Sequence, residues 1–223
     1  MHTNLSRRTF VTHAASAGLF AGAFLPMLSA KHHSSDRFTL GLSQYSLRAL
    51  LRDGSLDALD FPKFTVDQFG LHAIDLWEGG LPKDKLDDSK YLARMRNKAE
   101  QAGTDLFLLM SGVLDASEKK REASTAKIVA SFHRAVQLGA PMVRVFLKAP
   151  GTDPVAGQKA SVEALKPLAD EAAKRELTIA IEPGASPLSE KGAFLAQVAS
   201  KLKHPHGPRM DSPFLKAAPL SRK

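Results

Sequence analysis

Apolar and polar positions form a regular alternation of blocks from residue 38 onward. Short runs rich in β-branched and other apolar residues are each followed by a longer segment whose apolar residues recur every three or four positions. The pattern predicts strands at residues 38–42, 71–76, 105–110, 142–147 and 177–182. It predicts helices at residues 56–69, interrupted near Pro62, and at 89–102, 117–138, 155–175 and 190–202. Runs that are apolar on both sides and separated by amphipathic helices indicate an α/β fold with a parallel sheet.

Two architectures fit such an alternation, an open doubly wound sheet and a (β/α)8 TIM barrel. The turn after the first predicted strand reads Gly41-Leu42-Ser43-Gln44-Tyr45-Ser46, with neither a G-x-G-x-x-G motif nor a P-loop. A nucleotide-binding open sheet therefore lacks its usual sign. We expect a TIM-barrel type of fold that is incomplete, with about five to six β/α units.

Polar side chains fall where the predicted strands end, which is where chemistry is built in this architecture. Glu182 closes the fifth strand and is the first catalytic candidate, and Asp75 and Glu78 at the end of the second could act as a base or bind hydroxyls. Candidates for substrate contact are Gln44, Tyr45, Trp77 and Lys148. Each has a plainer alternative as a solvated acid, a helix cap, a core aromatic residue or a solvated lysine.

The formal net charge of +8 is concentrated at the two ends of the chain. Residues 1–30 carry Arg7 and Arg8 and no acid, while in residues 201–223 six basic side chains face Asp211 alone. The body between is close to neutral, so we expect no nucleic-acid partner. The chain has no cysteine, which excludes disulfides and thiolate ligands.

Arg7 and Arg8 precede a mostly small and apolar stretch at residues 14–30, the pattern of a twin-arginine leader. We expect residues 1–30 to be this signal peptide and residues 31–37 a polar spacer. The twin-arginine export machinery would then be a partner, and the protein would be periplasmic or secreted. If the leader is not cleaved, it would tether the protein to the membrane.

An ordered series of segments resembles the xylose isomerase-like TIM-barrel family, often called sugar phosphate isomerase/epimerase. The segments are Leu40-Gly41-Leu42-Ser43-Gln44-Tyr45-Ser46-Leu47-Arg48, Leu59-Asp60-Phe61-Pro62, Ala73-Ile74-Asp75-Leu76-Trp77, Leu138-Gly139, Val143-Arg144-Val145 and Ile181-Glu182. The resemblance covers about residues 38–206. It implies a divalent metal (manganese, magnesium or zinc) at the carboxyl ends of the strands, acting on a sugar or polyol.

The resemblance assigns Glu182 to the metal and places Asp211 near the next expected ligand, but the chain departs from the pattern nearby. Relatives follow the glutamate with Asn-His, whereas here Pro183-Gly184 follows, and Asp211 is flanked by Pro208 and Pro213. Strands seven and eight have no counterpart. We expect a partial barrel at residues 38–202 and a divergent basic tail at residues 203–223, with sheet edges open to self-association.

The resemblance therefore implies an exported sugar (phosphate) isomerase or epimerase that moves a proton or a hydride. A catalytically inactive, truncated barrel is the alternative, since the metal site looks incomplete. An abasic-site endonuclease, which uses the same barrel, is less favoured because it needs several histidine ligands and a basic groove.

Overall fold

The structure, a computed structural model, describes residues 39–202, and the predicted leader, spacer and basic tail lie outside this range. Five parallel strands form one sheet in the order β1-β2-β3-β4-β5. The strands are β1 (Gly41–Ser43), β2 (Ala73–Trp77), β3 (Asp105–Asp115), β4 (Met142–Lys148) and β5 (Thr178–Glu182). The α-helices are α2 (Arg48–Arg52), α3 (Phe61–Phe69), α4 (Ser89–Gln101), α5 (Glu118–Leu138), α6 (Pro154–Ala173) and α7 (Gly192–Leu202). Short 3-10 turns are η1 (Gln44–Leu47), η2 (Ala58–Asp60), η3 (Glu78–Gly80) and η4 (Lys83–Lys85).

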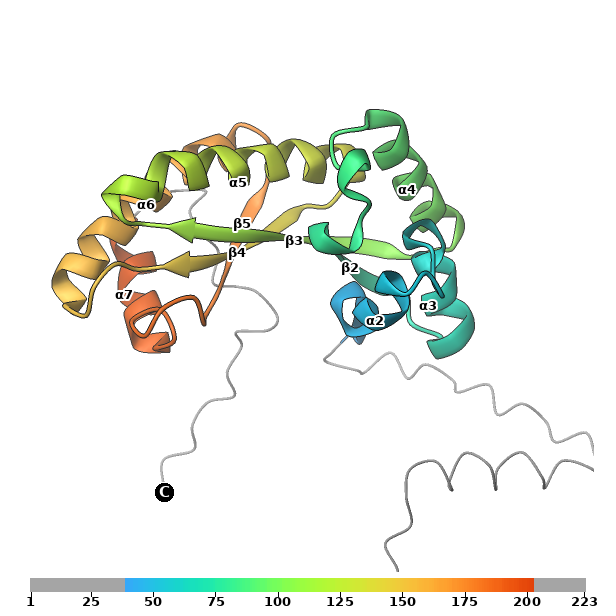
Figure 1. The fold of residues 1–223 in the computed structure, drawn as a ribbon, viewed down its shortest axis with the longest axis horizontal. Helices are drawn as coiled ribbons and strands as arrows, with labels where there is room; N and C mark the ends of the chain where they lie inside the picture. The colour runs from blue at the N-terminus through green and yellow to red at the C-terminus, as the bar shows by residue number, and fades with distance from the viewer. Residues whose placement is uncertain (1–38, 203–223) are drawn as a thin grey trace, which may run out of the picture. The chain divides into compact units, whose positions relative to one another are not determined.

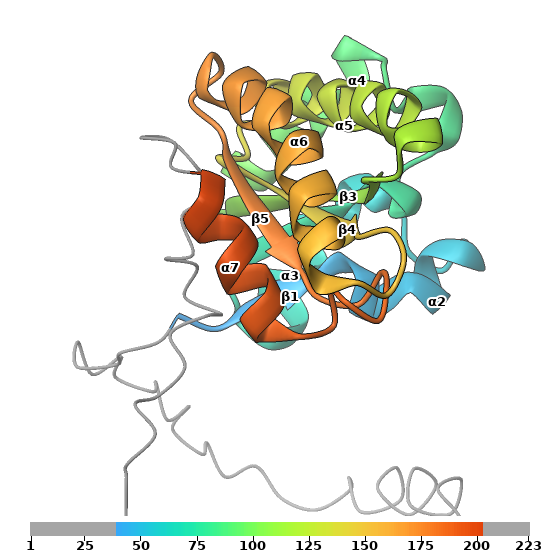
Figure 2. The same cartoon turned by 90° about the vertical axis from the view of Figure 1, so that its left-hand side faces the viewer.

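Each strand pairs with the strand that follows it in the sequence, and each crossover carries at least one helix. Consecutive helices from α3 to α7 also contact one another, so that they form a continuous layer along the sheet (Figures 1 and 2). Sequential parallel order with an outer layer of helices is the arrangement of a TIM barrel, here represented by five β/α units. Within residues 39–202, no helix is both long enough and apolar enough to cross a membrane.

The two faces of the sheet differ in character, as β4 illustrates. Val143, Val145 and Leu147 have no exposed surface and belong to the core that the helices cover. Successive side chains of a strand point to opposite faces, so Arg144 and Lys148 lie on the other face, which is the inner face of a barrel. In β4, the inner face therefore carries the charged side chains.

Local signals in the sequence explain where the helices begin and end. The carboxylate of Asp153 caps α6 by accepting hydrogen bonds from the backbone N–H groups of Val155 and Ala156, at 3.0 and 3.3 Å. Gly139 ends α5 in the left-handed conformation, with φ of 76°, which few other residues adopt without strain. The helix predicted at residues 117–138 therefore ends where α5 ends.

Strand β3 runs five residues past the predicted end at Met110 and closes on Asp115. The Ser111-Gly112 pair resembles a turn, but the strand continues through a register shift between Met110 and Val113 and pairs again with β4. The prediction of a short third strand was therefore wrong. As a consequence, Asp115 lies opposite Lys148 at the carboxyl ends of two paired strands.

The segment between β1 and β2 also differs from the prediction. The predicted helix at residues 56–69 consists of η2 and α3, and Pro62 lies in the first turn of α3 instead of interrupting a longer helix. A proline is tolerated there because the N–H groups of the first turn have no partner inside the helix. Strand β1 begins at Gly41, and η1 and α2 follow it where no helix was predicted.

Candidate functional site

Three charged side chains from three strands meet on the inner face of the sheet. Asp75 belongs to β2, Arg144 to β4 and Glu182 to β5. The Arg144 Nε atom lies 2.9 Å from the Glu182 Oε2 atom, an ion pair whose N–H is not aligned for a hydrogen bond. Asp75 is close enough to both that their charges influence its pKa. Asp75 and Glu182 were both predicted from the sequence as candidate residues, and the fold brings them to one end of the sheet.

Asp75 is buried, with 8% of its surface exposed. Its Oδ1 atom accepts hydrogen bonds from the Ser43 hydroxyl at 2.9 Å and from the Gln44 backbone N–H at 3.3 Å. Burial disfavours the charged carboxylate and raises the pKa of Asp75 to about 6, although these hydrogen bonds and the charge of Arg144 act in the opposite direction. Asp75 can therefore exchange a proton near neutral pH.

Arg144 is buried and fixed, whereas its partner Glu182 is half exposed, with 8% and 46% of the side chains accessible. The Arg144 Nη1 atom donates a hydrogen bond to the Ser111 carbonyl oxygen at 3.0 Å, and the guanidinium lies 4.2 Å from the centre of the Phe146 ring. A fixed positive charge thus lies beneath an accessible carboxylate. Sequence reasoning used Arg144 only as part of a motif. Arg144 alternates with the buried residues Val143 and Val145, and this position on the opposite face of the strand would have identified it.

Gln44, Tyr45 and Trp77 form one wall beside Asp75. Gln44 is fully buried and its Oε1 atom accepts a hydrogen bond from the Trp77 backbone N–H at 3.0 Å. The rings of Tyr45 and Trp77 are arranged edge to face, with their centroids 4.9 Å apart. The structure thus brings three of the four predicted substrate-contact residues together. Their contact with a substrate stays a prediction.

Gly79 allows the backbone to pass directly against the indole ring, since a Cβ atom at this position would overlap it. We expect Gly79→Ala to displace Trp77, the only tryptophan of the chain, and so to shift its fluorescence emission and increase quenching by acrylamide. Gly112→Ala is the matched control, because a Cβ there has open space around it. Equal spectra for the two variants would contradict the expected overlap.

Glu78 lies in η3 and is paired away from Asp75. Its Oε1 atom accepts a hydrogen bond from the Arg134 Nη1 atom at 2.8 Å, and Arg134 also lies 2.9 Å from the Asp87 carboxylate. This pairing joins η3 to α5. A catalytic role of Glu78 stays a prediction, and the ion pair supplies the structural alternative.

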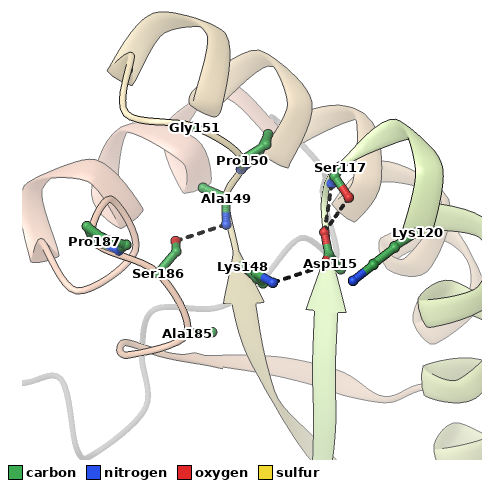
Figure 3. A pocket seen from close by; sticks show the side chains of 10 residues that line it. All are labelled: Asp115, Ser117, Lys120, Lys148, Ala149, Pro150, Gly151, Ala185, Ser186 and Pro187. Carbon is green, nitrogen blue, oxygen red and sulfur yellow. Dashed lines mark hydrogen bonds and ion pairs between the residues drawn. The ribbon is translucent and has the colours of Figure 1, made fainter.

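Lys148 ends β4 on the inner face, and its ammonium lies 3.4 Å from the Asp115 carboxylate (Figure 3). The Ser117 backbone N–H and hydroxyl donate to the same carboxylate, at 3.1 and 2.6 Å. Burial alone would raise the pKa of Asp115, but these contacts outweigh it and hold the pKa below its usual value. Sequence reasoning missed Asp115 because it placed the end of β3 too early.

The residues of this site do not suit a divalent metal by themselves. Among residues 39–202, no group of three or more histidine, aspartate or glutamate side chains could hold a metal ion. Glu182 is already paired with Arg144, and a cation placed beside a buried guanidinium would meet like charge. Asp211, the other predicted ligand, lies outside the described residues, so its pairing with Glu182 stays a prediction.

Comparison with solved structures finds relatives that share the fold at low sequence identity. They include the probable 3-DHS dehydratase AsbF of Bacillus anthracis, with 16% identity, a TM-score of 0.61, and coverage of 76% of this chain and 61% of that one. A putative xylose isomerase of Rhodospirillum rubrum has 12% identity, a TM-score of 0.60 and coverages of 74% and 62%. The IolI protein, solved with a binding zinc atom, has 15% identity, a TM-score of 0.58 and coverages of 75% and 60%. The chain thus spans about three fifths of the length of these structures.

Comparison with curated protein sequences gives no match. The family described as xylose isomerase-like TIM barrel matches residues 65–207, which is more than half of the chain. The matched range includes Asp75, Arg144 and Glu182, and the sequential parallel sheet with its outer helices agrees with it. The chain belongs to the xylose isomerase-like TIM barrel family.

Proposed function

We propose that this protein is an isomerase or epimerase that moves a proton on a sugar or a related polyol. The single observation that carries the proposal is the buried Asp75 carboxyl, whose pKa is about 6, on the inner face beside the Arg144–Glu182 pair. A general base works best when its pKa lies near the operating pH. The site also offers a fixed cation, an accessible carboxylate and an aromatic wall, which together suit a hydroxylated substrate with a carbonyl group.

Each group has a distinct task in this proposal. Asp75 removes a proton from the carbon next to the substrate carbonyl, and the electron pair forms an enediolate. The positive charge of Arg144 stabilises the developing oxyanion, and Glu182 accepts hydrogen bonds from substrate hydroxyls. For isomerisation, Asp75 returns the proton to the neighbouring carbon, while the proton of the adjacent hydroxyl passes to the former carbonyl oxygen. For epimerisation, Asp75 keeps the proton, and a second donor on the opposite face protonates the same carbon.

Incubation of the purified full chain with a panel of aldoses, ketoses and polyol acids in deuterium oxide tests the proposal. Proton transfer through Asp75 predicts that deuterium enters the substrate at the carbon next to the carbonyl, which NMR detects even when little product accumulates. A hydride shift between carbons would leave the product without deuterium and would overturn the role of Asp75. No turnover and no exchange across the panel would favour the alternative, a catalytically inactive barrel.

The pH dependence of turnover follows from the state that the base requires. Asp75 must be deprotonated to accept a proton, so we expect kcat/KM to rise through about pH 6 and to level off above it. A pH–rate profile on the most active substrate of the panel measures this. A profile that is flat between about pH 5 and 7 would contradict Asp75 as the base.

A divalent metal (manganese, magnesium or zinc) belongs to the proposal only if ligands from beyond residues 39–202, such as Asp211, complete the donor set around Glu182. The zinc atom named for the IolI structure supports this part of the proposal at the level of the family. Metal analysis of the purified full chain, together with the Asp211→Ala variant, tests it. Metal content that is equal in both proteins would remove Asp211 from the site.

The other proposals concern partners and location. We propose that the twin-arginine machinery exports the protein, which fractionation of cells carrying Arg7→Lys and Arg8→Lys together would test.

We also propose self-association through the edges of the sheet. Sedimentation measures it, and a monomer at all concentrations would contradict it. The endonuclease hypothesis is less favoured because the body of the chain is nearly neutral. A DNA titration at several salt concentrations tests it, and binding that weakens as the salt concentration rises would support it.

A further inference from the structure

A cavity of about 410 Å³ lies at the same end of the sheet as Glu182. Figure 3 shows it between the carboxyl ends of β3 and β4 and the segment that follows β5. The polar side chains that line it are Asp115, Ser117, Lys120, Lys148 and Ser186. We call this cavity the lysine pocket; the proposed proton transfer uses none of its residues.

The single carboxylate of the lysine pocket, Asp115, already has hydrogen-bond donors and a positively charged partner. Asp115 accepts two hydrogen bonds from Ser117, and its charge is balanced by Lys148 at 3.4 Å. Both lysines therefore remain as donors, because an ammonium group has three N–H bonds and Lys148 spends one at most on Asp115. The carboxylate acts as a support that holds Lys148 and Ser117 at the edge of the cavity.

Lys120 brings a second positive charge with no counterpart. Its ammonium extends toward the cavity from the first turn of α5 (Figure 3), and it forms no ion pair with any carboxylate of residues 39–202. The opposite wall is held in place by Ser186, whose hydroxyl accepts a hydrogen bond from the Ala149 backbone N–H at 3.1 Å. Two ammonium groups and one neutralised carboxylate give the lysine pocket a net positive charge.

The register of the sheet places the lysine pocket within reach of the proposed reaction site. Phe146 is the partner of Glu182 across β4 and β5, and Lys148 lies two residues further along β4 on the same face. Two residues of a strand span roughly 7 Å, the length of a short polyol chain. One substrate can therefore contact Glu182 and Lys148 at once.

We propose that the lysine pocket binds an anionic group, a phosphate or a carboxylate, carried by the substrate whose polyol part contacts Glu182. This inference rests on the proposed function and narrows its substrate class to sugars or polyols with an acidic end. Lys120 and Lys148 contact the anion, while Ser117 keeps its two hydrogen bonds to Asp115.

Calorimetric titration of the full chain at low ionic strength, with inorganic phosphate, glycerol 3-phosphate, glycerate and neutral glycerol as probes, tests the inference. We expect at least one anion to bind and glycerol not to bind, and Lys120→Met and Lys148→Met each to weaken binding about tenfold or more. Lys127→Met, on an exposed part of α5 outside the cavity, is the matched control and should leave affinity unchanged. Lys120 is exposed, so its replacement should not impair folding.

The outcomes separate the two anion sources and the two proposals. Tighter binding of glycerol 3-phosphate identifies a phosphate, and tighter binding of glycerate identifies a carboxylate. The absence of anion binding up to about 10 mM would contradict anion binding by the lysine pocket, as would an equal loss of affinity in Lys127→Met. Anion binding that depends on the lysines, without turnover, would support the lysine pocket and contradict the isomerase proposal. Turnover that does not depend on Lys120 would support the isomerase proposal and contradict the lysine pocket.

Discussion

Replacing Asp75 by asparagine is expected to lower kcat/KM about 10²–10⁴-fold, the usual contribution of a positioned general base. The side chain keeps nearly the same volume, so the contacts with Ser43 and the Gln44 backbone change little in space, but the proton acceptor is lost. Deuterium exchange into the substrate should fall by the same factor. Turnover assays on the most active substrate of the panel measure both.

The same substitution should not weaken the fold, which distinguishes a functional carboxyl from a structural one. The pKa of Asp75 in the folded protein, about 6, is higher than the ordinary value of 3.8. Its contribution to stability is therefore complete below pH 3.8 and is lost as the pH rises through 6. Asparagine does not titrate, so between about pH 4 and 7 the variant should gain up to about 3 kcal/mol in free energy of unfolding relative to the wild type.

Urea denaturation of both proteins at several pH values measures this difference. Asp105→Asn is the matched control, since Asp105 is exposed at the amino end of β3, away from the proposed site. We expect the control to keep its activity and the pH dependence of the wild type. An Asp75→Asn variant that is active, or that is less stable than the wild type at pH 7, would assign Asp75 a structural role.

Replacing Phe132 by alanine is expected to reduce the free energy of unfolding by about 3–5 kcal/mol. Phe132 has no exposed surface and lies on the face of α5 that packs against β3 and β4. Its removal leaves a cavity in the core that joins the helices to the sheet. A loss of this size is a large part of the stability of an ordinary domain.

Val136→Ala provides the control on the same helix, one turn further along, because 47% of Val136 is exposed. We expect a change within about 0.5 kcal/mol for this variant. Thermal or urea unfolding, followed by circular dichroism, measures both. If the two substitutions have equal effects, α5 does not pack against the sheet as described.

The succession of elements could be predicted from the sequence because it depends on local patterns. The strand at residues 142–147 and the helix at residues 117–138 agree with β4 and α5 within about a residue, since buried runs and a closing Gly139 are strong local signals. The errors occurred at β3 and between β1 and α3. At β3, pairing with β4 continues through a local turn signal. At α3, the prediction missed that Pro62 can occupy the first turn of a helix.

The candidate site was predictable in its position but not in its interactions. Glu182 and Asp75 could be chosen because polar residues at strand ends stand out against apolar runs. Asp115 was missed because its strand was predicted to end early, and the pairing of Arg144 with Glu182 depends on register between strands separated by a whole helix. No local pattern contains that information.

By itself, the sequence determined an α/β chain of the TIM-barrel type, because hydrophobic periodicity reflects which face of each element is buried. It also determined that the candidate polar residues Asp75, Lys148 and Glu182 fall at or near the carboxyl ends of the strands. The tertiary structure alone decided that burial raises the pKa of Asp75 to about 6, that Arg144 lies beside Glu182, and that Lys120 and Lys148 share one cavity. These properties arise from distances between strands and from burial, which only the packed sheet defines.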